Sequence, residues 1–224
     1  KLHPQPDPKL YYPRLPALEF IQRSAPGRVL GVECLPPKLL ESHQLKDIRG
    51  YDGVDPLGYI QLLSLSYDQQ MTSAPEYART MWYFPEFREP ATQGTSFQLH
   101  PVLNMLGLRY IVCHESVAIP DPVFQGGGYK VYLNENALPG AWIPQHTERL
   151  PSSDAILQSM RDWSFDPAQR AYTLESNAGF LDGGSGSVEL ISDNPQFMSL
   201  TATMETAGLV VIGDRYDSGW QATV

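Results

Sequence analysis

The stretch with the strongest potential for chemistry spans residues 47–52, which read Asp-Ile-Arg-Gly-Tyr-Asp. Asp47, Arg49, Tyr51 and Asp52 together supply hydrogen-bond donors, hydrogen-bond acceptors and an aromatic face. Glycan recognition uses this set of groups. A second interpretation is structural, because an aspartate and a nearby arginine can pair and fix a loop. The sequence leaves both interpretations open.

Carboxylates around this stretch also allow a hydrolase, which ranks last among our hypotheses. Glu41, Asp52 and Asp55 are the candidate acids. Glycoside hydrolysis needs two carboxyl groups about 5–9.5 Å apart across a cleft. The sequence does not show whether these three side chains converge.

Other catalytic and metal-binding motifs are incomplete. The glycine-rich run 183–187 lacks the closing glycine of a nucleophile elbow, and the run 126–130 leads into a strand instead of a helix. None of the five histidines stands in a His-Glu-x-x-His motif, and the two cysteines do not form a Cys-x-x-Cys pair. We therefore predict no catalytic residue, no metal site and no cofactor in this chain.

Aromatic residues suggest a separate binding surface. Residues 67–98 are irregular in pattern and rich in aromatic side chains, including Trp82 and Phe84. Such a segment either covers a core or stacks on sugars. The second option supports an alternative function, a stand-alone carbohydrate-binding β-sandwich module. Trp220 is a further candidate aromatic platform, with ordinary packing as the competing interpretation.

The two cysteines have two interpretations. Cys34 follows the apolar run 29–32, and Cys113 closes the apolar run 110–113. Both are either small buried side chains or partners in one disulfide between neighbouring strands. The sequence does not decide between them.

Composition excludes several classes of protein. The chain has 224 residues, with 16 basic against 25 acidic side chains and a net charge of -9, which argues against nucleic-acid binding. Hydrophobic residues make up 42%, enough for a folded core. The 18 glycines and 20 prolines argue against a helical bundle, because they break a chain into short elements. No apolar run approaches the roughly 18 residues of a membrane span.

The pattern of elements predicts an α+β fold. Residues 1–150 read as a mixed α/β part, and residues 151–224 as a β-rich, sandwich-like part. Asp55 is expected to cap the helix that follows it. The expected helices are 17–23, 56–65, 101–106 and 152–163. The expected strands are 28–32, 108–113, 129–133, 141–144, 171–175, 187–192, 197–204 and 208–212.

Four segments resemble the extracytoplasmic region of the bacterial YfhO-like family of multi-pass membrane proteins. The longest is RVLGVECLPPKLLESHQLKDIRGYDGVDPLGYIQLL, residues 28–63. LNMLGLRYIVC (103–113), YKVYLNENALPGAWI (129–143) and GDRYDSGWQATV (213–224) follow in the family's order. Gly140 stands where the family often has arginine, which weakens any charge-based role at that position.

The resemblance implies a function for the parent protein. Members of the family look like membrane glycosyltransferases that use a polyprenyl-linked sugar donor and modify cell-wall polymers such as lipoteichoic acid. Their catalytic acid lies in a loop between membrane helices that this chain lacks. The chain is then an accessory extracytoplasmic domain on the cell membrane, not catalytic alone. Its partners would be the membrane portion of its own chain and a glycan or cell-wall polymer.

The ends of the chain lead to one more expectation. The first residue is a lysine, and residues 220–224 read as a strand still in progress. We expect the natural chain to continue beyond this sequence.

Overall fold

The computed structural model describes residue 7 and residues 13–50, 55–68, 79–89, 97–174, 184–194, 196–216 and 218–223, with Arg79 and Trp82 described by their backbone alone. Helices and several small sheets occur together, which confirms the predicted α+β class. The chain divides into two compact units, each formed by separate stretches of sequence. The first unit comprises residues 1–55, 68–99 and 108–136; the second comprises residues 56–67, 100–107 and 137–224. The predicted division near residue 150 stays a prediction.

The first unit is built on a four-stranded sheet with the order β1-β4-β6-β5. Strand β1 runs parallel to β4, and β6 runs antiparallel to both β4 and β5. The bounds are α1 (Pro16–Gln22), β1 (Arg28–Gly31), α2 (Pro37–Ser42), η2 (Arg79–Trp82), β2 (Phe87–Arg88), β3 (Gln98–Leu99), β4 (Leu108–His114), β5 (Phe124–Gly126) and β6 (Tyr129–Leu133).

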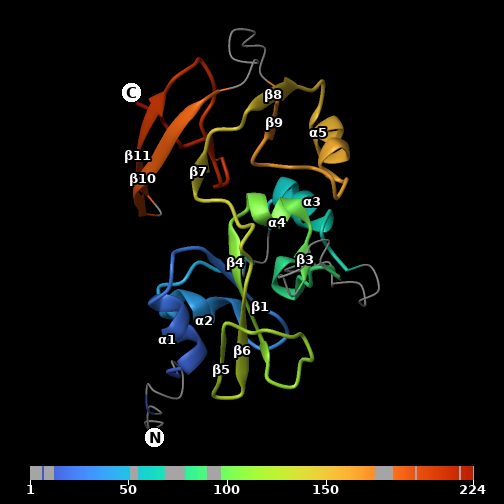
Figure 1. Ribbon diagram of the computed structural model, residues 1–224, viewed down its shortest axis with the longest axis vertical. Helices are drawn as coiled ribbons and strands as arrows, with labels where there is room; N and C mark the ends of the chain where they lie inside the picture. Colours follow the sequence, from blue (N-terminus) through green and yellow to red (C-terminus); the bar gives the residue numbers. More distant parts are fainter. Residues whose placement is uncertain are drawn as a thin grey trace, which may run out of the picture. The chain divides into compact units, whose positions relative to one another are not determined.

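Helix α1 covers one face of this sheet. Its apolar residues fall on one side of the helix, and Leu18 and Ile21 pack there against Val29, Tyr110 and Val112. Figure 1 shows α1, in blue, beside the yellow-green strands β5 and β6, both of which it contacts. Strand β4 is buried along most of its length, as expected for an apolar run in the middle of a sheet.

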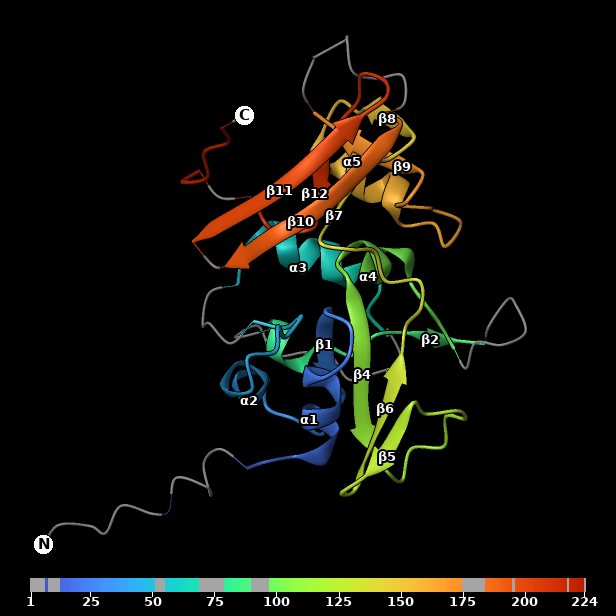
Figure 2. The same cartoon turned by 60° about the vertical axis from the view of Figure 1, so that its left-hand side comes forward.

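Among the residues that the structure describes, the second unit contains three helices and three two-stranded sheets. The sheets pair β7 with β12, β8 with β9, and β10 with β11. The bounds are α3 (Leu57–Ser64), α4 (Pro101–Met105), β7 (Ala141–Trp142), β8 (His146–Arg149), α5 (Ser153–Met160), β9 (Arg170–Thr173), β10 (Gly186–Asn194), β11 (Phe197–Met204) and β12 (Val211–Ile212). Figure 2 shows β10 and β11 as a long antiparallel ribbon.

Side chains cap two of the helices in this unit. Ser152, the first residue of the predicted helix 152–163, accepts a hydrogen bond from the Ala155 amide at the start of α5. At the start of α4 the fully buried His100 takes this role, with Nδ1 accepting from the Val102 amide at 3.3 Å. Gly107, at φ +68°, follows α4 in a left-handed conformation that glycine adopts without steric cost.

Some local predictions were wrong. Asp55 makes no capping hydrogen bond to α3, whose N-cap position is Pro56, because the Asp55 carboxylate binds Thr80 instead. Residues 220–223 form no strand. Of the two interpretations of the cysteines, the structure agrees with the one without a disulfide: Cys34 and Cys113 are free thiols, Cys113 buried and Cys34 partly buried.

The described part of the chain holds no helix with the length and apolar content needed to cross a membrane.

Candidate functional site

Asp47 and Arg49 form a closed ion pair beside strand β1. The guanidinium of Arg49 donates from Nη2 to Asp47 Oδ2 at 2.8 Å and from Nε to Oδ1 at 3.0 Å. The Arg49 amide also donates to Oδ1 at 2.8 Å, and Nη2 donates to the Leu35 carbonyl at 3.0 Å. Asp47 also forms a parallel β-bridge with Val29, which attaches the backbone at Asp47 to the outer edge of β1.

This pair is buried. Both side chains are 4% exposed, and the mutual hydrogen bonds occupy both carboxylate oxygens of Asp47. Burial raises the pKa of the Asp47 carboxyl above its ordinary value, while the hydrogen bonds and positive charge of Arg49 oppose that rise. The geometry is that of the loop-fixing interpretation. Direct glycan binding by Asp47 and Arg49 stays a prediction.

Thr80 joins the two ends of the segment that follows this pair. Its Oγ1 accepts from the Gly50 amide at 3.0 Å and donates to Asp55 Oδ1 at 2.9 Å. The Thr80 amide donates to Asp55 Oδ2 at 3.0 Å. We call Gly50, Asp55 and Thr80 the Thr80 anchor. Thr80 is 3% exposed, so these bonds are shielded from competition with water.

Gly50 allows the anchor to close this tightly. A Cβ atom at residue 50 would lie 2.8 Å from Asp55 Oδ1 and 2.9 Å from Thr80 Oγ1, too close for any larger residue without displacement. The anchor therefore requires glycine immediately before Tyr51. Tyr51 and Asp52 lie outside the described residues, and in the sequence they fall between the two anchored residues.

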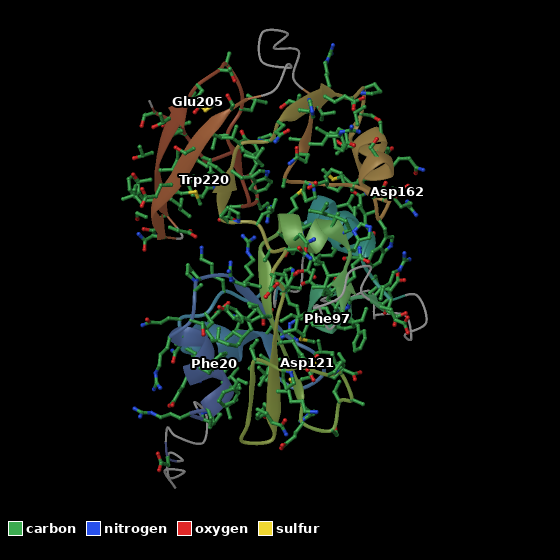
Figure 3. All side chains as sticks on the ribbon, in the orientation of Figure 1. Phe20, Phe97, Asp121, Asp162, Glu205 and Trp220 are labelled. Atoms are coloured by element: carbon green, nitrogen blue, oxygen red, sulfur yellow. The ribbon has the colours of Figure 1, made fainter. Side chains whose placement is uncertain are left out.

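A row of aromatic rings lies in the same unit. Phe84, Phe87, Phe97 and Tyr132 meet edge to face in that order, with ring-centroid distances of 6.2, 5.6 and 6.1 Å. We call these four residues the aromatic row; Phe97 is labelled in Figure 3. Tyr132 is buried, whereas the three phenylalanines are half-buried and keep part of their surface at the solvent. The row therefore packs against the buried Tyr132 ring and keeps part of its phenylalanine surface exposed.

The two tryptophan candidates, Trp82 and Trp220, are not among the four residues of the aromatic row. The backbone of Trp82 ends η2, two residues after Thr80, and its side chain lies outside the described residues. Trp220 belongs to the second unit, is labelled in Figure 3 and is 39% exposed. A ligand-binding role for either side chain stays a prediction.

The structure does not test the hydrolase hypothesis, which stays a prediction. Glu41 lies near enough to Asp47 for its charge to raise the pKa of the Asp47 carboxyl, although burial is the larger cause of that rise. Asp47 is bound to Arg49, and Asp55 is bound to Thr80. Asp52, which the hydrolase hypothesis requires, lies outside the described residues. In the part of the chain that the structure covers, no three His, Cys, Asp or Glu side chains gather in a way that would hold a metal ion.

Sequence reasoning missed Thr80 as the residue that binds both Gly50 and Asp55. It lies 30 residues from Gly50 and 25 from Asp55, in a stretch without any recognisable motif. The one sequence feature that could have indicated the anchor was Asp55, an acidic residue in a turn close to the 47–52 stretch. The helix-capping rule instead assigned Asp55 to the helix that follows it.

Comparison with known protein families, with curated proteins and with solved structures finds no match to this chain.

Proposed function

We propose that this chain is an accessory extracytoplasmic domain of a bacterial membrane protein that resembles lipid-linked-sugar-dependent glycosyltransferases of cell-wall polymers. It is not catalytic alone. Its task is to present the segment with Tyr51 and Asp52 to a glycan acceptor. The four family-like segments support the assignment to such a parent protein.

The Thr80 anchor is the observation that carries this proposal. A buried threonine binds both residues that flank the segment 51–54, and the buried Asp47–Arg49 pair fixes the chain just before it. Fixing the residues on both sides of a binding segment lowers the conformational entropy that is lost when a ligand binds. An arrangement that fixes both flanks of a polar, aromatic segment is what a presentation role requires.

A glycan titration tests the proposal. Cell-wall polymer fragments and their component sugars are added to the 224-residue chain while backbone NMR shifts and tryptophan fluorescence are followed. We expect saturable shifts at the Arg49 and Gly50 amides. Thr80→Val removes the hydroxyl that binds both flanks, and we expect it to weaken glycan affinity about tenfold.

Thr80→Ser is the matched control, because it keeps the hydroxyl and should keep the affinity. Thermal unfolding of each variant separates lost binding from lost folding. Thr80 is buried, so its effect on affinity must pass through the residues that it anchors. If millimolar glycan causes no saturable shift near Arg49, the acceptor-presenting role is rejected.

The aromatic row supports a second candidate function, a carbohydrate-binding module that stacks sugars on phenylalanine rings. In that case the shifts centre on residues 84–89 and 97–99 instead of 49–50. Phe87→Leu should then abolish binding, whereas Phe20→Leu should not. Phe20 is also half-buried and stacks on Phe124, away from the aromatic row.

A further inference from the structure

The hairpin of β10 and β11 has one edge that is suited to adding another strand. Among the described residues, β10 and β11 form a sheet of two strands only. Strand β10 is the one that contacts β7, which makes β11 the outer strand of the hairpin (Figure 1). An unpaired strand edge presents backbone donors and acceptors that pair readily with another chain.

The hydrogen-bond pattern shows which groups of β11 face outward. The Glu205 amide donates to the Ser185 carbonyl at 2.8 Å, and bonded pairs alternate along an antiparallel ladder. With Ala202 opposite Val188, the backbone amides of Leu200, Ala202 and Met204 point away from β10. Within the part of the chain that the structure describes, no strand pairs with this outward row of donors and acceptors.

The two edges of the hairpin differ in protection. Strand β10 carries Glu189 and Asp193 and a bulge between Leu190 and Ser192, which are features that discourage strand addition. Strand β11 reads Phe-Met-Ser-Leu-Thr-Ala-Thr-Met, without charge, proline or glycine. Phe197 is 62% exposed and Met204 is 37% exposed. Only the β11 edge lacks the usual protection.

The neutrality of β11 makes a second copy of the same strand a compatible partner for this edge. The chain as a whole carries a net charge of -9, yet β11 is neutral over eight residues. A charged peptide would find no opposite charge on β11. A second β11, running antiparallel, would pair neutral residues with neutral residues along its whole length.

We propose that β11 mediates association of two copies of this chain. The two β11 strands pair antiparallel across a two-fold axis and join the two hairpins into one four-stranded sheet. The outward amides of Leu200, Ala202 and Met204 supply the hydrogen bonds.

Sedimentation velocity over about a hundredfold range of protein concentration tests this interface. We expect a reversible monomer–dimer equilibrium. In the dimer, hydrogen exchange should slow at Leu200, Ala202 and Met204. Ala202→Pro removes one outward amide and leaves the bonds to β10 in place, and it should weaken dimerisation at least about tenfold. Ala202→Val is the matched control, because it retains the amide and should still dimerise.

A second pair of variants guards against misfolding of the proline variant. Thr203 and Ser187 lie directly opposite each other, both exposed, on the same face of the hairpin. Thr203→Lys places a charge on the β11 edge and should weaken the dimer, whereas Ser187→Lys on β10 should not. The proposal is overturned if the chain stays monomeric throughout. It is also overturned if Ala202→Pro and Thr203→Lys leave a dimer intact, or if Ser187→Lys disrupts it equally.

Discussion

At the scale of single residues, two ion pairs show how burial determines the contribution of an ion pair to the stability of the fold. Asp47 and Arg49 are 4% exposed and share several hydrogen bonds. Arg23 and Glu19 lie 3.8 Å apart on the surface of α1, where their side chains are 80% and 36% exposed. Removing one partner of a buried pair leaves an uncompensated charge, whereas water replaces the lost partner at the surface.

Arg49→Met should therefore lower the free energy of unfolding by about 3–5 kcal/mol, because Asp47 remains buried without its partner. Arg23→Met is the matched control and should cost less than about 1 kcal/mol. Urea denaturation followed by circular dichroism measures both changes. If both variants lose the same free energy of unfolding, the Asp47–Arg49 pair does not fix the chain around residues 47–49.

The two free thiols should make the protein less stable at alkaline pH. Burial raises the pKa of Cys34 from 9.0 to about 12 and the pKa of Cys113 to about 11. Above about pH 9 the unfolded chain loses these protons and the folded chain keeps them, so the free energy of unfolding falls as pH rises. The fall continues until the folded thiols ionise.

Denaturation curves measured from pH 8 to about pH 11 check this expectation. Cys34→Ala and Cys113→Ala should each make the free energy of unfolding fall less steeply with pH. The change in slope should correspond to at most about one proton for each variant. Alkylation of the native thiols should stay slow at pH 8 and become fast in denaturant, because the thiolate is the reactive form. A native protein that alkylates as fast as the unfolded chain would contradict the raised pKa values.

The residues of the candidate site differ in how far the sequence could predict them. Asp47 and Arg49 lie two residues apart, so their pairing was visible as one of two interpretations. Thr80 was invisible, since its partners are 25 and 30 residues away. Asp55 was assigned wrongly, because a local capping rule competes with tertiary partners, and Thr80 offers two donors to its carboxylate.

At the scale of elements, the sequence predicted those helices and strands that the local pattern of apolar residues determines. The expected strands 108–113 and 129–133 correspond to β4 and β6, and the expected helix 152–163 corresponds to α5. Strand pairing is a long-range property, so the order β1-β4-β6-β5 and the parallel pair of β8 and β9 had no local signal. His100 was missed as a cap because histidine is not among the residues that usually begin helices.

At the scale of the whole molecule, net charge and the neutral β11 edge act in opposite directions. Every copy carries a charge of -9, which repels a second copy over distances comparable with the Debye length. The paired strands themselves contribute no charge to the proposed interface. Long-range repulsion should therefore weaken a dimer whose local contacts are apolar and backbone-mediated.

Raising the salt concentration from about 20 mM to about 200 mM should strengthen dimerisation several-fold, because the Debye length shortens and screens the repulsion. Lowering the pH toward the isoelectric point near 4.9 should act in the same direction, since the net charge falls. Sedimentation at each condition measures the dissociation constant, and Ala202→Pro should stay largely monomeric throughout. A dimer that weakens with salt would instead depend on attractive charge pairs, which β11 does not have, and would place the interface elsewhere on the molecule.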